Sequence, residues 1–229
     1  MADAPRPPLE RLAYAVSHDL GAPVRHIGQY LALLKPRLGP LDPRAEQYVE
    51  RIEAANGRLA EKLQDVLRFS RVMTQGRPPV PTDAAEAFDA ACARLGVRLG
   101  QVGASVTSEG LGEVLADPAQ LNDLLVELIS NSIEFVAPDT APVVTVRGHA
   151  TAAGRRIEVR DNGIGVQGHV GREIFDLWRT LHPAGTYPGR GVGLALCELI
   201  VERHGGSIGF ESEPGAGSCF WFELPSKSA

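Results

Sequence analysis

A histidine followed at once by an acidic residue stands near the start of the chain, in the segment Ser17-His18-Asp19-Leu20. Neutral imidazole is a good nucleophile near physiological pH. A neighbouring carboxylate can fix its tautomer and accept its proton. A single histidine in a helix is more often structural, so the case for chemistry at His18 depends on Asp19 and on Pro23 five positions later.

Three polar residues, Glu127, Asn131 and Glu134, lie in the segment LLVELISNSIEF. At 100° per residue they fall within about 60° of one another on a helix, opposite an apolar side. Such a stripe is most often a solvated face. An asparagine oxygen can, however, serve a magnesium ion that also holds phosphate oxygens. The segment is therefore a candidate metal and nucleotide site.

Two glycine-rich segments follow, DNGIG at 161–165 after the strand-like RRIEVR, and GRGVGL at 189–194 at the start of a predicted helix. Glycines at a helix start let backbone N–H groups approach phosphates, where the helix dipole also helps. Either segment alone is more often just a turn. All four motifs in this order favour a phosphoryl-transfer protein.

The elements that must position these residues begin with a helix over 9–38, in which apolar residues recur mainly at spacings of three and four. After the break LGPLDP, a second helix is predicted over 43–73, with Asp42 as its N-cap and Pro43 at its first position. Two such helices form an antiparallel hairpin. One hairpin cannot cover its own apolar stripe, so a homodimeric four-helix bundle is expected over residues 1–75.

A proline-rich linker is predicted at 76–82, followed by an α+β domain at 83–229. The irregular, glycine-rich stretch 162–190 is predicted to be a functional loop. Helices are predicted at 83–99, 118–136 and 191–204, and strands near 103–107, 112–116, 142–149, 155–161, 206–212 and 217–224.

Composition narrows the function further. The net charge of −5, with no basic block, argues against nucleic-acid binding. The three cysteines match no metal-ligand spacing and are expected to be reduced thiols. No segment approaches the roughly 20 apolar residues of a membrane span, so we expect a cytoplasmic protein with no membrane segment in this chain.

Over nearly its whole length the chain resembles sensor histidine kinases. SHDLGAP at 17–23 is similar to their phospho-acceptor box, and ELISN, DNGIG and GRGVGLAL are similar to the three boxes of their ATP site. REIFDLW at 172–178 and the tail from ELIVERHGG onward also match the pattern. The segments around VSHDLGAPVRHI and TYPGRGVGLAL look closest to the output modules of phytochrome-type receptors.

The resemblance implies a dimerisation and histidine-phosphotransfer hairpin followed by a GHKL-type ATP-binding sandwich. It implies ATP and Mg²⁺ as cofactors and a response regulator receiver domain as partner, whose aspartate takes the phosphoryl group from His18. Asp19 would be the orienting base and Asn131 the metal ligand. The implied nucleotide-binding residues are Glu127, Asn131, Asp161, Gly163, Gly165, Arg190, Gly191, Gly193 and Leu194.

Four positions depart from the family pattern, the first being Gly21, which replaces the usual polar or basic residue after His-Asp-Leu. Glu134 stands where a basic residue near the phosphates is common, which puts phosphate contacts in doubt. Glu127 stands where many members have Asn, and relatives that hydrolyse ATP use Glu there as a base. Ala22 stands where kinases with strong phosphatase activity tend to carry Thr or Asn. Two other functions stay open: a phosphotransfer or scaffold protein with a degenerate ATP site, and a GHKL-type ATPase.

Overall fold

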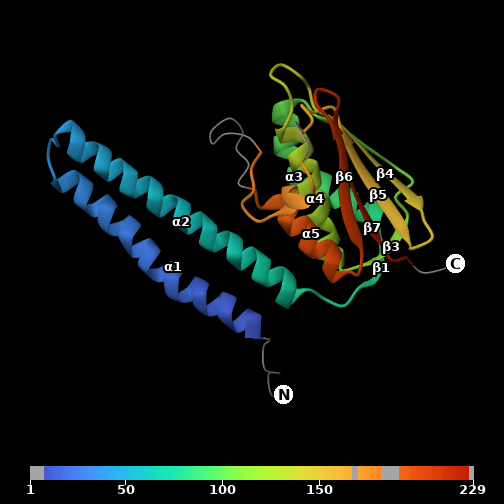
Figure 1. The fold of residues 1–229 in the computed structure, drawn as a ribbon, viewed down its shortest axis with the longest axis horizontal. Coiled ribbons are helices and arrows are strands. Elements are labelled where there is room, and N and C mark those ends of the chain that lie inside the picture. The colour runs from blue at the N-terminus through green and yellow to red at the C-terminus, as the bar shows by residue number, and fades with distance from the viewer. Residues whose placement is uncertain (1–7, 167–169, 182–190, 227–229) are drawn as a thin grey trace. The chain divides into compact units, whose positions relative to one another are not determined.

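The computed structural model describes residues 8–166, 170–181 and 191–226, with side chains from Asp19 onward. The chain divides into two compact units, Met1–Gln75 and Gly76–Ala229. The first unit is helical and the second combines helices with a sheet (Figure 1). This is the predicted fold class, a helical region followed by an α/β sandwich.

The first unit is an antiparallel pair of helices, α1 (Pro8–Leu34) and α2 (Pro43–Gln75). The Asp42 carboxylate accepts hydrogen bonds from the backbone N–H groups of Arg44 and Ala45, both at 2.9 Å, so the predicted start of α2 is confirmed. The predicted first helix ends earlier than expected, because residues Lys35–Arg37 form a 3₁₀ turn, η1. Pro36 lies in that turn, and proline restricts the residue before it and donates no backbone hydrogen bond.

The hairpin leaves much of its apolar surface exposed. Val24 and Leu63 are buried, but Tyr30 and Leu33 are 68% and 60% exposed. Other large apolar side chains of this unit are also exposed: Leu20, Ile27, Leu34, Leu38, Tyr48, Ile52, Leu59 and Met73.

In the second unit, the described residues form a five-stranded sheet in the order β2-β4-β5-β7-β6. Strand β2 pairs with β4 in parallel, and the other neighbours are antiparallel. Three helices, α3 (Ala84–Val102), α4 (Pro118–Glu134) and α5 (Gly193–Arg203), lie over one face of the sheet (Figure 1). The strands are β2 (Ser105–Glu109), β4 (Val143–Ala150), β5 (Arg155–Asp161), β6 (Ser207–Glu213) and β7 (Gly217–Leu224).

The core of this unit lies between the sheet and α4. The strands supply alternating apolar residues such as Val146, Ile157 and Phe222, which are fully buried. Helix α4 supplies Leu121 and Leu125 among others, also fully buried. Burial of each such side chain is worth about 1.5–3 kcal/mol relative to exposure. Because the apolar side of α4 packs on the sheet, its polar side faces away from the sheet.

The proline-rich stretch after α2 belongs to the second unit. Strand β1 (Val80–Asp83) pairs with β3 (Glu113–Ala116), and the Arg77 N–H donates to Asp117 Oδ2 at 2.6 Å. The Arg203 guanidinium donates to the Arg77 carbonyl at 3.1 Å. The sequence suggested no strand here, because proline is normally excluded from ladders and is accommodated only at sheet edges such as this two-stranded one.

A buried histidine joins the start of α4 to the end of α5. His204 Nε2 accepts from the Asp117 N–H at 2.9 Å, and Nδ1 lies 2.7 Å from the Ile200 carbonyl. The ring is therefore the neutral tautomer that carries its proton on Nδ1. Burial lowers the pKa of His204 below its usual value. Asp117 Oδ1 in turn caps α4 through the Ala119 N–H at 3.0 Å.

Candidate active site

The predicted nucleophile lies on α1, in the first unit. The backbone of His18 is helical, and its side chain lies outside the described residues. Asp19, the next residue, has an exposed side chain. Ala22 is half-buried and stands four residues after His18, so the two share a face of the helix.

Asp161, the last residue of β5, carries a carboxylate held by two backbone donors. Its Oδ1 accepts from the N–H groups of Gly163 and Ser218, both at 2.9 Å. Burial raises the pKa of Asp161 above its ordinary value, although these hydrogen bonds oppose the shift. Because the carboxylate is half-buried and fixed in orientation, it suits recognition of a hydrogen-bond donor on a ligand.

The glycines after Asp161 allow three backbone segments to meet. A Cβ on Gly163 would collide with the Phe135 carbonyl oxygen at the end of α4. Gly165 has a φ of +66°, and a Cβ there would collide with the Glu213 carbonyl. The Ile164 N–H donates to the Phe135 carbonyl at 2.9 Å. The predicted glycine loop is thus fastened directly to the C-terminal end of α4.

Helix α4 presents its half-buried acids to two different neighbours. Glu127 Oε2 lies only 2.8 Å from the place that a Cβ on Gly193 would occupy, so Glu127 packs against the start of α5. Glu134 Oε2 instead forms an ion pair with Arg98 Nη2 of α3 at 2.8 Å. Asn131 stands between them on the helix and is half-buried. Sequence reasoning missed Arg98, although Arg94 and Arg98 are spaced to share a face of the predicted helix.

The second glycine segment closes the turn that leads into α5. Gly191 has a φ of +69°, and its carbonyl accepts from the Trp178 N–H at 2.7 Å. Helix α5 begins at Gly193, and its N-cap residue, Val192, makes no side-chain capping bond. Arg190 lies outside the described residues. The structure thus brings Gly193 and Leu194 to the first turn of a helix whose N–H groups point towards the site.

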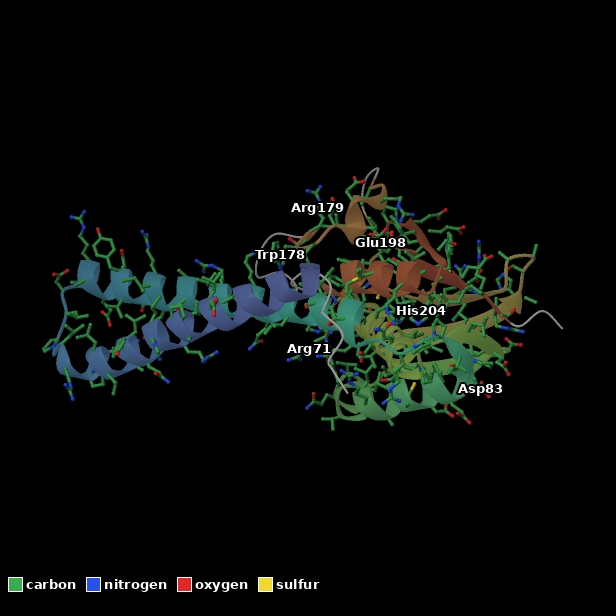
Figure 2. The ribbon with its side chains drawn as sticks, turned by 90° about the horizontal axis from the view of Figure 1, so that it is seen from below. Arg71, Asp83, Trp178, Arg179, Glu198 and His204 are labelled. Atoms are coloured by element: carbon green, nitrogen blue, oxygen red, sulfur yellow. The ribbon has the colours of Figure 1, made fainter. Side chains whose placement is uncertain are left out.

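Trp178 and Arg179 lie near the N-terminal end of α5, whereas His204 lies at its other end (Figure 2). Trp178 is exposed and has a φ of +63°, a backbone conformation that is unusual for a bulky residue. It follows a short 3₁₀ helix, η2 (Arg172–Phe175), within the stretch predicted to be a long loop. Arg172 of η2 pairs with Glu198 of α5, which fixes the start of this segment to the helix.

The residues present fit a magnesium nucleotide. Oxygen donors from Asn131 and Glu127 are of the kind that Mg²⁺ prefers. The first turn of α5, which begins with Gly193 and Leu194, lacks a side-chain cap and suits phosphate oxygens. The fixed carboxylate of Asp161 suits an exocyclic amino group of a base.

Comparison with known proteins accounts for both units. Residues 116–228 match the family described as histidine kinase-, DNA gyrase B-, and HSP90-like ATPases. Residues 9–75 match the His Kinase A (phospho-acceptor) domain. Among the described residues, no helix has both the length and the apolar character needed to cross a membrane.

Curated relatives cover nearly all of this chain. Phytochrome-like protein Cph1 of Synechocystis sp. is 34% identical over 218 residues, which is 95% of this chain and 29% of that protein. Histidine protein kinase DivJ of Caulobacter vibrioides is 31% identical over 92% of this chain and 36% of its own length. The crystal structure of full-length ShkA in complex with AMPPNP has a similar fold, with a TM-score of 0.67 at 24% identity over 96% of this chain and 46% of that one.

Proposed function

Because this chain belongs to the histidine kinase family, with a phospho-acceptor domain followed by an ATPase-type domain, we propose that it phosphorylates itself on His18 from ATP. The observation that carries the proposal is that the candidate phospho-acceptor and the candidate nucleotide site belong to different units. The first carries a histidine and an adjacent acid on one helix, and the second carries a nucleotide-type site built from α4, the glycine loop and α5.

The nucleotide is held by two ends of this site. Asp161 accepts a hydrogen bond from the adenine amino group, next to Gly163 and Gly165. The phosphates lie at the first turn of α5, beside Gly191, Gly193 and Leu194. Arg190, which precedes Gly191 in the sequence, is proposed as a further nucleotide-binding residue. Asn131, beside Glu127, would hold a magnesium ion, which would neutralise charge on the phosphates.

The chemistry is an in-line transfer. A ring nitrogen of His18 forms a bond to the γ-phosphorus while the bond from that phosphorus to the bridging oxygen breaks, and ADP leaves. Asp19 orients the ring and takes its proton. In a second transfer, a carboxylate oxygen of an aspartate on a response regulator receiver domain displaces the histidine nitrogen from phosphorus.

The first unit assembles as a homodimer. In a single hairpin, apolar side chains of both helices stay exposed, including Tyr30, Leu33 and Ile52. A second copy packed as a four-helix bundle removes this surface from water. Light scattering at micromolar concentration should report a dimer, and a monomer there would contradict the assembly.

The function is tested by incubating the chain with labelled ATP and mapping the phosphorylated residue. His18→Gln should abolish acid-labile, base-stable phosphate while ATP binding persists. The matched control is His26→Gln, which removes an exposed histidine of the same helix and should leave phosphorylation intact. Substantial acid-labile phosphate on the His18 variant would reject the assignment.

A further inference from the structure

We propose that Arg98 of α3 is a positioning residue for nucleotide binding, because it neutralises the half-buried acid Glu134 and so keeps it from repelling the phosphates. This inference rests on the proposed ATP site and identifies a residue of another helix on which that site depends. The observations that carry it are the ion pair itself, the place of Glu134 on α4, and a second ion pair between the same two helices.

Glu134 lies at the edge of the nucleotide-type site. It follows Asn131 by three residues, which is a rise of about 4.5 Å and a rotation of about 60° on the helix. The next residue, Phe135, accepts the backbone N–H of Ile164 in the glycine loop at 2.9 Å. The Glu134 side chain is only 14% exposed, so solvent screens its charge poorly.

The Arg98 guanidinium contacts two residues of α4, Glu134 and Ser130. Its Nη2 lies 2.8 Å from Glu134 Oε2, and its Nη1 donates to Ser130 Oγ at 2.7 Å. Ser130 is the residue directly before Asn131. Helix α3 is held in place by buried apolar residues such as Phe88 and Leu95. The guanidinium is therefore held over the part of α4 that carries the proposed metal ligand, and its planar fork matches the two acceptors.

The charge balance of the site gives this pair its importance. Asp161 and Glu127 are already carboxylates, and the ligand adds several negative charges of its own. With an effective dielectric constant of about 40 and a separation of about 8 Å, an uncompensated Glu134 would weaken binding by a factor of about five for each phosphate charge. For a net ligand charge of about two after magnesium binds, the two factors multiply to a loss of about 25-fold.

The chain offers a matched control in the ion pair Arg94–Asp123, at 2.5 Å, between the same two helices. Its side chains are 55% and 42% exposed, compared with 41% and 14% for Arg98 and Glu134. Asp123 precedes Asn131 by eight residues, about 12 Å along the axis. Arg94→Gln therefore removes the same kind of bond and the same charge without exposing an acid at the site.

The experiment measures the affinity of the purified full chain for adenosine, ADP and magnesium with a non-hydrolysable ATP analogue, by calorimetry at low and high salt. Arg98→Gln should weaken binding of the ATP analogue about 25-fold and binding of ADP less, and should leave the affinity for adenosine unchanged. Glu134→Gln should bind the analogue at least as tightly as the unmodified chain. The double variant Arg98→Gln with Glu134→Gln should bind the analogue within about twofold of the unmodified chain. Arg94→Gln should bind it as the unmodified chain does. Because the Glu134 side chain is little exposed, high salt should reduce the loss of affinity in Arg98→Gln only in part.

Two results would overturn the proposal. If the double variant stays as weak as Arg98→Gln, the guanidinium contacts the phosphates directly instead of masking Glu134. If adenosine affinity falls as far as that of the ATP analogue, Arg98 only supports the fold of α3 and α4. Failure of the unmodified chain to bind any of the three ligands would reject the proposed ATP site, and this inference with it.

Discussion

Replacement of Asp161 by asparagine should separate the stability of the second unit from its affinity for ATP. The carboxylate accepts two backbone N–H groups at 2.9 Å, and an asparagine oxygen can accept the same two bonds. The amide NH₂ of the asparagine then replaces the second carboxylate oxygen. It places a donor where the proposed adenine amino group needs an acceptor. Loss of such a bond, with a buried donor left unpaired, costs about 1–3 kcal/mol. ATP affinity should therefore fall by roughly tenfold to a hundredfold.

The expected effect on folding has the opposite sign. The pKa of Asp161 is raised by burial, so the native state favours the neutral form more than the unfolded chain does. At pH 7 the ionised carboxylate then contributes less stability than a neutral group of the same shape would. The free energy of unfolding of Asp161→Asn should therefore be unchanged or higher.

The assay pairs chemical denaturation with calorimetric titration of ATP. Asn162→Ala is the control, because Asn162 accepts from the Val143 N–H at 2.8 Å and donates to the Ala141 carbonyl at 3.0 Å. It should lose stability and keep ATP affinity. The reasoning is refuted if Asp161→Asn binds ATP normally, or if it loses stability as Asn162→Ala does.

Three further predictions concern other parts of the chain. Asn131→Ala should lose magnesium-dependent autophosphorylation while the free energy of unfolding changes by less than about 1 kcal/mol; full activity across a magnesium titration would place the metal elsewhere. Ala22→Thr should speed loss of phosphate from a phosphorylated receiver domain in the presence of ADP, because a hydroxyl can hold the attacking water; rapid loss with the unmodified chain would contradict this. Because burial lowers the pKa of His204, the unfolded chain takes up the proton first, and the free energy of unfolding should fall as pH drops below about 6.5. Denaturation at pH 7.5 and 5.5 should show this fall, and His204→Gln should flatten it.

Much of the fold could be predicted from local patterns. Strands over 155–161 and 217–224 and the start of the second helix at Pro43 are found where the sequence placed them, because period-two alternation and the Asp42 cap are local signals. Strand β1 was missed because its proline, Pro81, argues against a strand, and its pairing with β3 is not visible in the sequence.

The site was predictable where a short motif carries it and was not where two helices meet. The structure brings Asp161 to Gly163 and Glu127 to Gly193, and each of these residues belongs to a segment that the sequence singled out. Arg98 reaches Glu134 across 36 residues of sequence. That pairing depends on how α3 packs on α4, and a single sequence gives no register for such packing. The ion pair that Glu134 forms with Arg98 therefore becomes visible only in the structure.

Two backbone hydrogen bonds of Arg77 fix the stretch of chain that follows α2. Helix α2 ends at Gln75, and only Gly76 separates it from the Arg77 N–H that binds Asp117. A Cβ on Gly76 would collide with the Arg203 guanidinium, so the chain passes there with no room to spare. Asp117 is the cap of α4, the helix that carries Asn131. The two oxygens of Asp117 therefore hold two segments at once, Oδ2 the stretch that follows α2 and Oδ1 the first turn of α4.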